Sequence, residues 1–153
     1  MHALELKIPP PVVALVNVGA MWGISLFAPL LEMPTFIRVT AAVTIALAGF
    51  GIGLAGIIAF RRARTTANPM KPETTSALVC SGIYRATRNP MYAGVLFLLV
   101  AWAVSLSSGW ALLGAMAFML YINRFQITPE ERVLLAMFGT DYAAYKTRVR
   151  RWL

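Results

Sequence analysis

The sequence predicts an all-α integral membrane protein with about four transmembrane helices, the last two forming a helical hairpin. Three observations support this fold class. Of the 153 residues, 59% are hydrophobic and only 13% are charged, against about 25% charged residues in soluble domains. Two segments of membrane-spanning length carry no charge, and a third is long enough to fold back on itself. We expect a single domain over residues 1–153.

Residues 12–31 and 39–60 are the uncharged segments that predict the first two membrane helices. Each is close to the roughly 20 residues that cross a hydrocarbon core of about 30 Å. A signal peptide is disfavoured, because the apolar part is too long, Glu5 precedes it and no small-residue cleavage site follows. We therefore expect both segments in the mature protein. The prolines at positions 9–11 should open the first helix.

Residues 91–123 form the third uncharged segment, which is too long for one span and somewhat short for two. Small residues of the kind that mark turns interrupt it. They are Ser105, Ser107, Ser108 and Gly109. We expect a hairpin with arms at 91–106 and 110–123. Its short arms imply local bilayer thinning or burial against the other helices.

The net charge of +8 is unevenly placed along the chain. In a four-span arrangement, Arg38 is the one basic residue in an outer loop. The positive-inside rule then predicts that both termini and the polar loop between the second and third spans are cytoplasmic, which suits a bacterial inner membrane. A basic chain also suggests nucleic-acid binding, but so apolar a composition argues against it. We expect no nucleic-acid partner.

Residues 51–56, Gly-Ile-Gly-Leu-Ala-Gly, match the dinucleotide-binding fingerprint letter for letter. That fingerprint needs a preceding strand in a soluble β-α-β unit, and here it lies inside an uncharged membrane segment. Gly49 and Gly53 also form a Gly-x-x-x-Gly pair, which permits close packing of two helices. Helix packing is therefore the preferred interpretation.

Residues 61–89 form the longest polar stretch between spans. Asn68-Pro69 and Lys71-Pro72 argue against a continuous helix there, and a loop of this length is uncommon unless it is functional. Two arginines and two tyrosines accompany the next helix entry. They are Arg85, Arg88, Tyr84 and Tyr92. The arginines could be ordinary interfacial residues, or they could bind an anion together with the free backbone donors beyond Pro90.

Thr128-Pro129-Glu130-Glu131 predicts the start of a helix, with Thr128 as the cap and Glu131 completing a capping box. Glu130 would then point elsewhere, where it could meet an ammonium group. Both glutamates also suit a helix N-terminus on electrostatic grounds alone. Gly139 should end this helix, and Thr140-Asp141 should start another.

The last predicted helix is amphipathic, with Tyr142, Tyr145 and Val149 on one face and Trp152 nearby. Such a helix is expected to lie along the lipid headgroups. Its aromatic residues could be interfacial anchors or ligand contacts, and anchors are the commoner case. Cys80 is expected to be a packing residue, because nothing beside it in the sequence could act as its base.

Three groups of residues, in this order and at this spacing, resemble the isoprenylcysteine carboxyl methyltransferases and the wider group of phosphatidylethanolamine and related phospholipid methyltransferases. They are Leu78-Val79-x-Ser81-Gly82-x-Tyr84-Arg85, then Arg88-Asn89-Pro90-Met91-Tyr92-x-Gly94, and finally Glu130-Glu131 with Phe138-Gly139-x-x-Tyr142-x-x-Tyr145. The resemblance covers about residues 65–153 and does not indicate one substrate.

The resemblance implies a membrane enzyme that uses S-adenosylmethionine without a Rossmann domain. It implies two N-terminal spans in residues 1–60 and a cofactor-binding catalytic half in residues 61–153, whose C-terminal helices form a cytosolic pocket. The expected cofactor-binding residues are Ser76, Ala77, Leu78, Val79, Tyr84, Arg88, Asn89, Pro90, Met91, Tyr92 and Glu130. Glu130 would pair with the methionyl ammonium. Arg88, or the amides near Asn89-Pro90, would hold the carboxylate, and Leu78-Val79 would hold the adenine.

Arg124, Gln126 and Glu131 are the expected substrate-binding residues. Gln126 stands about where carboxyl methyltransferases have an arginine that meets the substrate carboxylate, and Arg124 is not in register with it. Asn89 stands where many relatives have histidine. Unlike histidine, an asparagine side chain cannot carry a proton. The acceptor is expected to be lipophilic, delivered by the membrane lipids, and to present a carboxylate, amine or thiol. No catalytic base is assigned, although Glu131 and Tyr92 are candidates, and no metal-ligand spacing is present.

Two other classes compete with a methyltransferase. A small four-helix transporter suits the length and span count, but the three uncharged segments lack the ionisable group that would couple transport. A non-catalytic or reductase-like membrane protein with a similar C-terminal half is the other alternative, and binding of a nicotinamide nucleotide would distinguish it.

Overall fold

The computed structural model describes residues 5–29, 31–65 and 70–153, so the Asn68-Pro69 pair lies outside the described residues. Every regular element in those ranges is helical, which confirms the all-α class. The α-helices are α1 (Pro10–Phe27), α2 (Thr35–Arg62), α3 (Pro90–Ser105), α4 (Leu112–Ile122) and α5 (Thr128–Arg148). The shorter helices are η1 (Pro72–Thr74), η2 (Gly82–Arg85), η3 (Gly109–Ala111) and the π-helix η4 (Asn123–Ile127).

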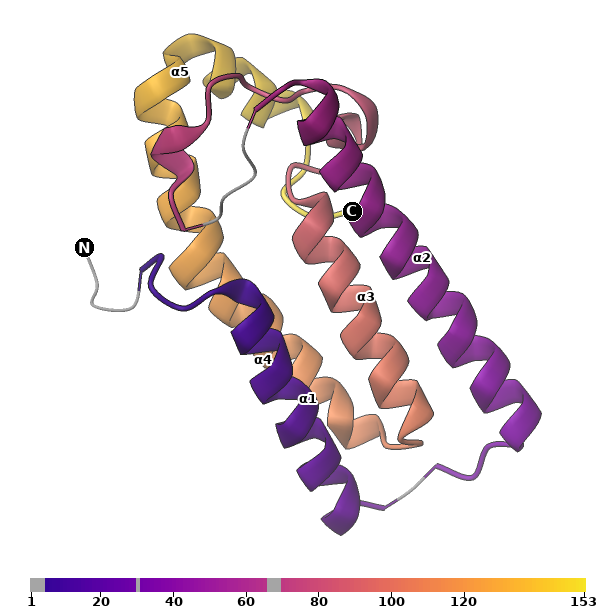
Figure 1. Cartoon of the computed structure of the whole chain (residues 1–153). Helices are drawn as coiled ribbons and strands as arrows, with labels where there is room; N and C mark the ends of the chain where they lie inside the picture. Colours follow the sequence, from indigo (N-terminus) through magenta and orange to yellow (C-terminus); the bar gives the residue numbers. More distant parts are fainter. Residues whose placement is uncertain (1–4, 30, 66–69) are drawn as a thin grey trace.

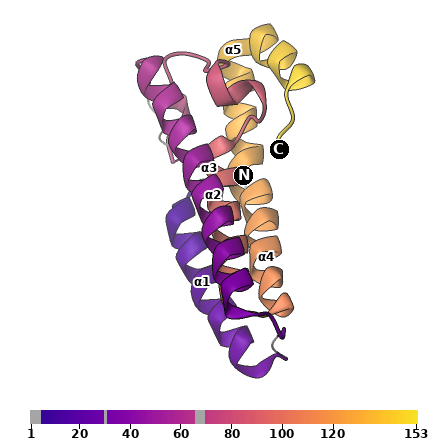
Figure 2. The ribbon, with the colours of Figure 1, turned by 90° about the vertical axis from the view of Figure 1, so that its right-hand side faces the viewer.

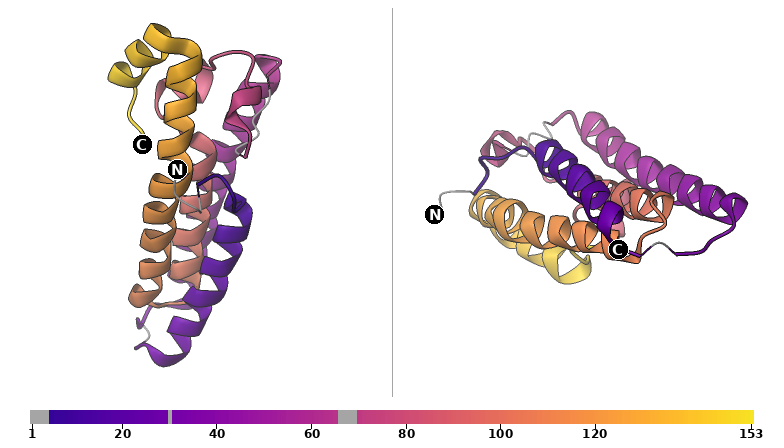
Figure 3. Two further views of the ribbon diagram at one scale, coloured as in Figure 1. Left: turned by 90° about the vertical axis from the view of Figure 1, so that its left-hand side faces the viewer. Right: turned by 90° about the horizontal axis from the view of Figure 1, so that it is seen from below.

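Helices α1 to α4 run side by side as an elongated bundle (Figure 1, Figure 2). The connections from α1 to α2 and from α3 to α4 lie at one end. At the other end lie α5, the polar stretch between α2 and α3, and the C-terminal tail of residues 149–153. Helix α3 contacts α2 on one side and α4 on the other, as the view from below in Figure 3 also shows. The bundle therefore has a polar end, called the cavity end below.

Helices α1 and α2 are long and apolar enough to cross a membrane, and they match the two predicted spans. Helix α1 stops at Phe27 because Ala28, which precedes Pro29, is extended. Helix α2 begins at Thr35, directly after Pro34. Helix α3 has 16 residues, fewer than the roughly 20 that span a bilayer. The predicted hairpin of α3 and α4 is present, but the count of four spans is not confirmed.

The predicted glycine packing joins α2 and α3. A Cβ atom added at Gly49 would lie 2.8 Å from the Gly94 carbonyl oxygen. One added at Gly94 would lie 2.6 Å from the Gly49 oxygen and 2.9 Å from the Gly53 nitrogen. Backbone atoms cannot move aside as a flexible side chain can, so these positions require glycine. The α2–α3 seam, defined by Gly49, Gly53 and Gly94, fixes how α3 enters the cavity end.

Helix α5 begins at Thr128, as predicted, but the predicted cap is wrong, because α4, η4 and α5 follow one another without a break. Ile127 already has helical dihedral angles, and the Thr128 hydroxyl donates backward to the Asn123 carbonyl at 2.7 Å instead of capping α5. The π-helix carries the chain through this junction. The break at Gly139 is confirmed, since its φ of 47° and ψ of −120° kink α5 there.

Candidate functional site

A cavity of about 110 Å³ lies at the cavity end. It is large enough for several water molecules, and it is lined from α2, the polar stretch, α3, η4 and α5. The lining residues are Phe60, Pro72, Thr75, Ala77, Leu78, Val79, Tyr84, Arg88, Asn89, Met91, Tyr92, Ile127, Glu130, Glu131, Leu134, Tyr142 and Tyr145. Segments far apart in the sequence thus meet around one space.

Most of the residues expected at the cofactor line this cavity, and two do not. Ser76 is exposed, and its amide and hydroxyl contact the Thr65 hydroxyl at 2.9 and 3.1 Å. Pro90 is buried against α2, close to Gly56.

Of the three residues expected at the acceptor, Glu131 lines the cavity and the other two lie outside it. The Arg124 side chain is 48% exposed and its guanidinium lies 3.6 Å from Glu5. Gln126 is 2% exposed and lies behind Glu130. Arg124, Gln126 and Glu131 are thus close in sequence but do not line one common surface.

The cavity is also lined by residues that the sequence analysis did not assign to the cofactor or the acceptor, namely Phe60, Pro72, Thr75, Ile127, Leu134, Tyr142 and Tyr145. Tyr142 and Tyr145 are 3% and 4% exposed, so the preferred interpretation, in which they anchor the helix at the headgroups, is wrong. The Tyr145 hydroxyl donates to the Tyr84 carbonyl at 2.7 Å. Their three-residue spacing did predict a shared face. The kink at Gly139 turns that face toward the cavity.

Glu130 is a buried carboxylate held by neutral donors. The Tyr92 hydroxyl donates to its Oε1 at 2.7 Å, and the Gln126 amide donates to the same oxygen at 2.9 Å. Burial raises the pKa of Glu130 to about 7, although both hydrogen bonds work in the opposite direction. Near neutral pH this carboxyl group is therefore ready to change charge when a ligand arrives.

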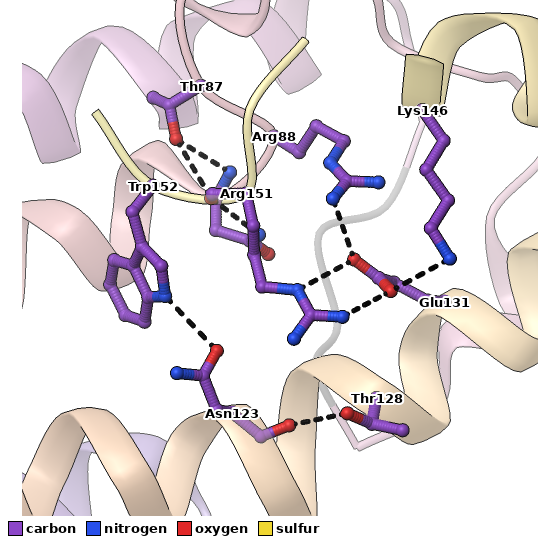
Figure 4. A network of polar contacts seen from close by, with 9 residues as sticks. Thr87, Arg88, Asn123, Thr128, Glu131, Lys146, Arg151 and Trp152 are labelled. Atoms are coloured by element: carbon purple, nitrogen blue, oxygen red, sulfur yellow. Dashed lines mark hydrogen bonds and ion pairs between the residues drawn. The ribbon is translucent and has the colours of Figure 1, made fainter.

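Glu131 has the opposite environment, because three cations surround it (Figure 4). Arg151 donates from Nε and Nη2 at 3.1 and 2.7 Å. Arg88 Nη2 lies at 3.3 Å, and Lys146 Nζ at 3.4 Å. Burial alone would raise the pKa of Glu131, but the Arg151 hydrogen bonds and the three positive charges hold it below its ordinary value. Glu131 is therefore a firmly ionised group and a poor proton acceptor.

Arg88 is only partly satisfied by this arrangement. Its side chain is 9% exposed, and its Nε and Nη1 atoms have no hydrogen-bond partner among the described residues. A buried donor without a partner is costly, and a buried cation more so. Three cations against the single Glu131 carboxylate also leave an excess of positive charge. The cavity wall therefore presents donors and positive charge that are suited to an anion.

The C-terminal tail closes this wall on one side (Figure 4). The Arg88 amide donates to the Arg150 carbonyl at 2.9 Å. The side chains of Thr87 and Asn89 donate to the Arg151 carbonyl at 3.2 and 3.0 Å. Asn89 thus uses its side-chain amide on the tail, although the residue still lines the cavity.

The tyrosines and the cysteine near the cavity are neutral at physiological pH. Burial raises the pKa of Tyr142 to about 12, and it also raises the pKa values of Tyr84 and Tyr145. As neutral phenols they can donate hydrogen bonds, as the Tyr145 hydroxyl does to the Tyr84 carbonyl. Burial likewise raises the pKa of Cys80, which removes thiolate character and favours the packing role.

Comparison with known proteins identifies the family. A family model described as phospholipid methyltransferase matches residues 37–141 of this chain. The chain belongs to this family. A protein of Haemophilus influenzae that is described only as uncharacterised is 48% identical over 63 residues, which make up 41% of this chain and the whole of that protein. The family expected from the sequence motifs is thus confirmed, and methyltransferase activity at a membrane is implied.

The family match covers much, but not all, of the site. It begins early in α2 and ends just after the Gly139 kink. It therefore includes the lining residues from Phe60 to Leu134. Helix α1, the two inward-facing tyrosines and the C-terminal tail lie outside the matched range. The cavity is therefore lined partly by residues inside the matched range and partly by Tyr142 and Tyr145, which lie just beyond it.

Proposed function

We propose that this phospholipid methyltransferase family member transfers a methyl group from S-adenosylmethionine to a lipophilic acceptor at the membrane surface. One observation carries the proposal. A single cavity presents a buried carboxylate, Glu130, and a buried guanidinium with unpaired donors, Arg88. Together these groups complement the ammonium and carboxylate of an amino-acid zwitterion, which is one end of the cofactor.

The residues present fit that cofactor. Arg88 Nε and Nη1 would donate to the methionyl carboxylate and so gain the partners that they lack. Glu130 would meet the ammonium, and this pairing would offset the cost of ionising a buried carboxyl. Phe60, Leu78 and Val79 provide an apolar wall suited to the adenine. When bound, the cofactor supplies an electrophilic methyl group on a sulfonium.

The chain's own residues contribute mainly orientation and exclusion of water. Methyl transfer requires the acceptor atom to approach in line, and holding two reactants in place can supply about 7–11 kcal/mol in favourable cases. The acceptor would arrive sideways between the membrane helices. A carboxylate or thiolate acceptor needs no base, whereas an amine or a thiol must lose a proton.

The proposed orientation places the cavity and both termini in the cytoplasm of a bacterial inner membrane. The cavity end carries the cluster of Arg88, Lys146 and Arg151. Arg38 lies toward the opposite end of the bundle, where it donates to Ser107 at 3.0 Å in the turn after α3. This distribution supports the orientation through the positive-inside rule.

Calorimetry on the detergent-purified protein tests the proposal. Both S-adenosylmethionine and its demethylated product should bind in the micromolar range, and NADPH should not. Glu130→Ala should abolish that binding, whereas Glu73→Ala, at an exposed glutamate outside the cavity, should not. Binding of NADPH alone would favour the reductase-like alternative. No binding in detergent and in lipid nanodiscs would overturn the proposal.

A further inference from the structure

Gln126 contacts the candidate site without facing the cavity. Its amide donates to Glu130 Oε1 at 2.9 Å, while its side chain is almost fully buried and does not line the cavity. The amide must present its nitrogen here, because the flipped orientation would set its oxygen against a carboxylate oxygen. Gln126 therefore acts on a bound molecule through the residues that it contacts, Glu130 and Tyr92.

The backbone around Gln126 is anchored from both ends of the described chain. The Leu6 amide donates to the Phe125 carbonyl at 3.1 Å, and the Trp152 indole donates to the Asn123 side chain at 3.1 Å. π-Helices are rare and often mark functional sites. In this protein the π-helix holds Gln126 one helical turn before Glu130, where the two side chains meet.

We propose that Gln126 is a positioning residue: its hydrogen bond turns the Glu130 carboxylate toward the cavity and favours its ionised form. The inference rests on the proposed function, because its consequence is stronger binding of the cofactor's ammonium group near neutral pH. Gln126 and Tyr92 both donate to the same oxygen. Oε2 is then the oxygen that an ammonium group would meet.

Several other groups act on Glu130 from the surrounding elements. Tyr84 on η2, Tyr92 on α3, and Glu131 and Tyr142 on α5 interact with it electrostatically. The hydroxyls are neutral, and Glu131 is compensated by its three cations, including Arg88 from the loop before α3. Of the two side chains that donate directly to Glu130, Gln126 is the one that can be changed without altering the cavity wall.

The test compares cofactor binding by the wild type and Gln126→Met, which keeps the length of the side chain and removes the donor. Dissociation constants are measured at about pH 7 and about pH 9, and at each pH the dissociation constant of the variant is divided by that of the wild type. This ratio cancels the titration of the ligand's own amine. We expect binding to be about fivefold weaker at about pH 7 and less than twofold weaker at about pH 9. These ratios follow if loss of the hydrogen bond makes the Glu130 carboxyl a tenfold weaker acid.

A second ligand separates positioning from a general structural role. Methylthioadenosine has the adenine and ribose but no ammonium group, so its affinity should not change in Gln126→Met. Asn123→Ala is the matched control variant, because it removes a hydrogen bond from the same π-helix without touching Glu130. It should lower the melting temperature and leave the pH dependence as in the wild type.

Specific outcomes would overturn the inference. A binding ratio that does not vary with pH would contradict it, as would equal weakening of both ligands or the same pH shift in Asn123→Ala. If Gln126→Met does not fold, Gln126→Asn takes its place, since the shorter amide should not reach Glu130 and should give the same pH-dependent ratio. If the wild type itself does not bind S-adenosylmethionine, the proposed function fails rather than the role of Gln126.

Discussion

The α2–α3 seam and the cavity end are stabilised in different ways. At the seam, backbone approaches backbone through Gly49, Gly53 and Gly94, and no charge takes part. At the cavity end, the neighbouring Glu130 and Glu131 differ in pKa because their surroundings differ. Burial raises the pKa of Glu130, and three cations lower that of Glu131. At the seam, Gly49 and Gly94 leave no room for an added Cβ atom, whereas the cavity end depends on a balance of charge.

Rigidity and the capacity to bind a ligand are therefore located in separate parts of this molecule. The seam delivers Met91 and Tyr92 to a fixed position, because both lie within a turn of Gly94 on α3. The cavity end keeps unpaired donors on Arg88 and a protonatable group at Glu130. Substitutions at the two regions should therefore differ in their dependence on pH.

Glu131→Gln should cause the largest loss of stability, about 3 kcal/mol. Removing one partner of a buried ion pair usually costs about 3–5 kcal/mol, and the low end applies because Lys146 and Arg151 are partly exposed. Arg88 would then be buried without its carboxylate. Denaturant unfolding in detergent measures the loss, with exposed Glu73→Gln as the control. A loss below about 1 kcal/mol would remove Glu131 from its central role in the cluster.

Glu130→Gln should have the opposite sign, with a gain of about 2–3 kcal/mol at about pH 8. The unfolded carboxyl releases its proton near the ordinary pKa of 4.5, whereas the folded group retains it up to about 7. Wild-type stability should therefore fall as pH rises between these values, and the variant should lack this slope. Unfolding curves over that range check the prediction, and an advantage that also persists at about pH 4 would contradict it.

Gly94→Ala should destabilise the protein by about 2 kcal/mol, in the range typical of overpacking. The added methyl would meet backbone atoms of Gly49 and Gly53. Gly51→Ala is the matched control on α2, because nothing lies within 4 Å of its added Cβ. It should be neutral or slightly stabilising. Melting temperatures should show a loss for Gly94→Ala that does not vary with pH, and a pH-dependent loss would blur the contrast with the cavity end.

Arg132→Gln should have the smallest effect, below about 1 kcal/mol. Its guanidinium lies 2.7 Å from Glu5, but the side chain is 54% exposed. The effect should shrink further in high salt, because solvent ions screen such pairs. Melting temperatures in low and high salt measure this loss of stability, with the exposed Arg62→Gln as the control. A loss comparable to that of Glu131→Gln would show that the contact between Arg132 and Glu5, in the segment before α1, is as important as the cation cluster.

Features encoded locally were predictable from the sequence. Uncharged segments, prolines and the Ser-rich turn were sufficient for α1, α2 and the hairpin, and the glycine pattern indicated the seam. The cap predicted at Thr128 is wrong because the chain enters α5 through a π-helix, whose i→i+5 hydrogen bonds leave no compositional signal in the sequence. The inward turn of Tyr142 and Tyr145 failed for a different reason. It depends on the kink at Gly139 and on contact with Tyr84, which lies 61 positions earlier.

The pairing of the C-terminal tail with the loop before α3 also has a kinetic consequence. The contacts that close the cavity, from Thr87, Asn89 and Tyr145, join residues 61 to 64 positions apart. Closing such long loops is entropically costly, whereas membrane helices form and pair earlier. The cavity end should thus assemble after the bundle during folding. By the same argument it should open before the bundle does, so the Arg88 amide should exchange its hydrogen sooner than the amides of α3.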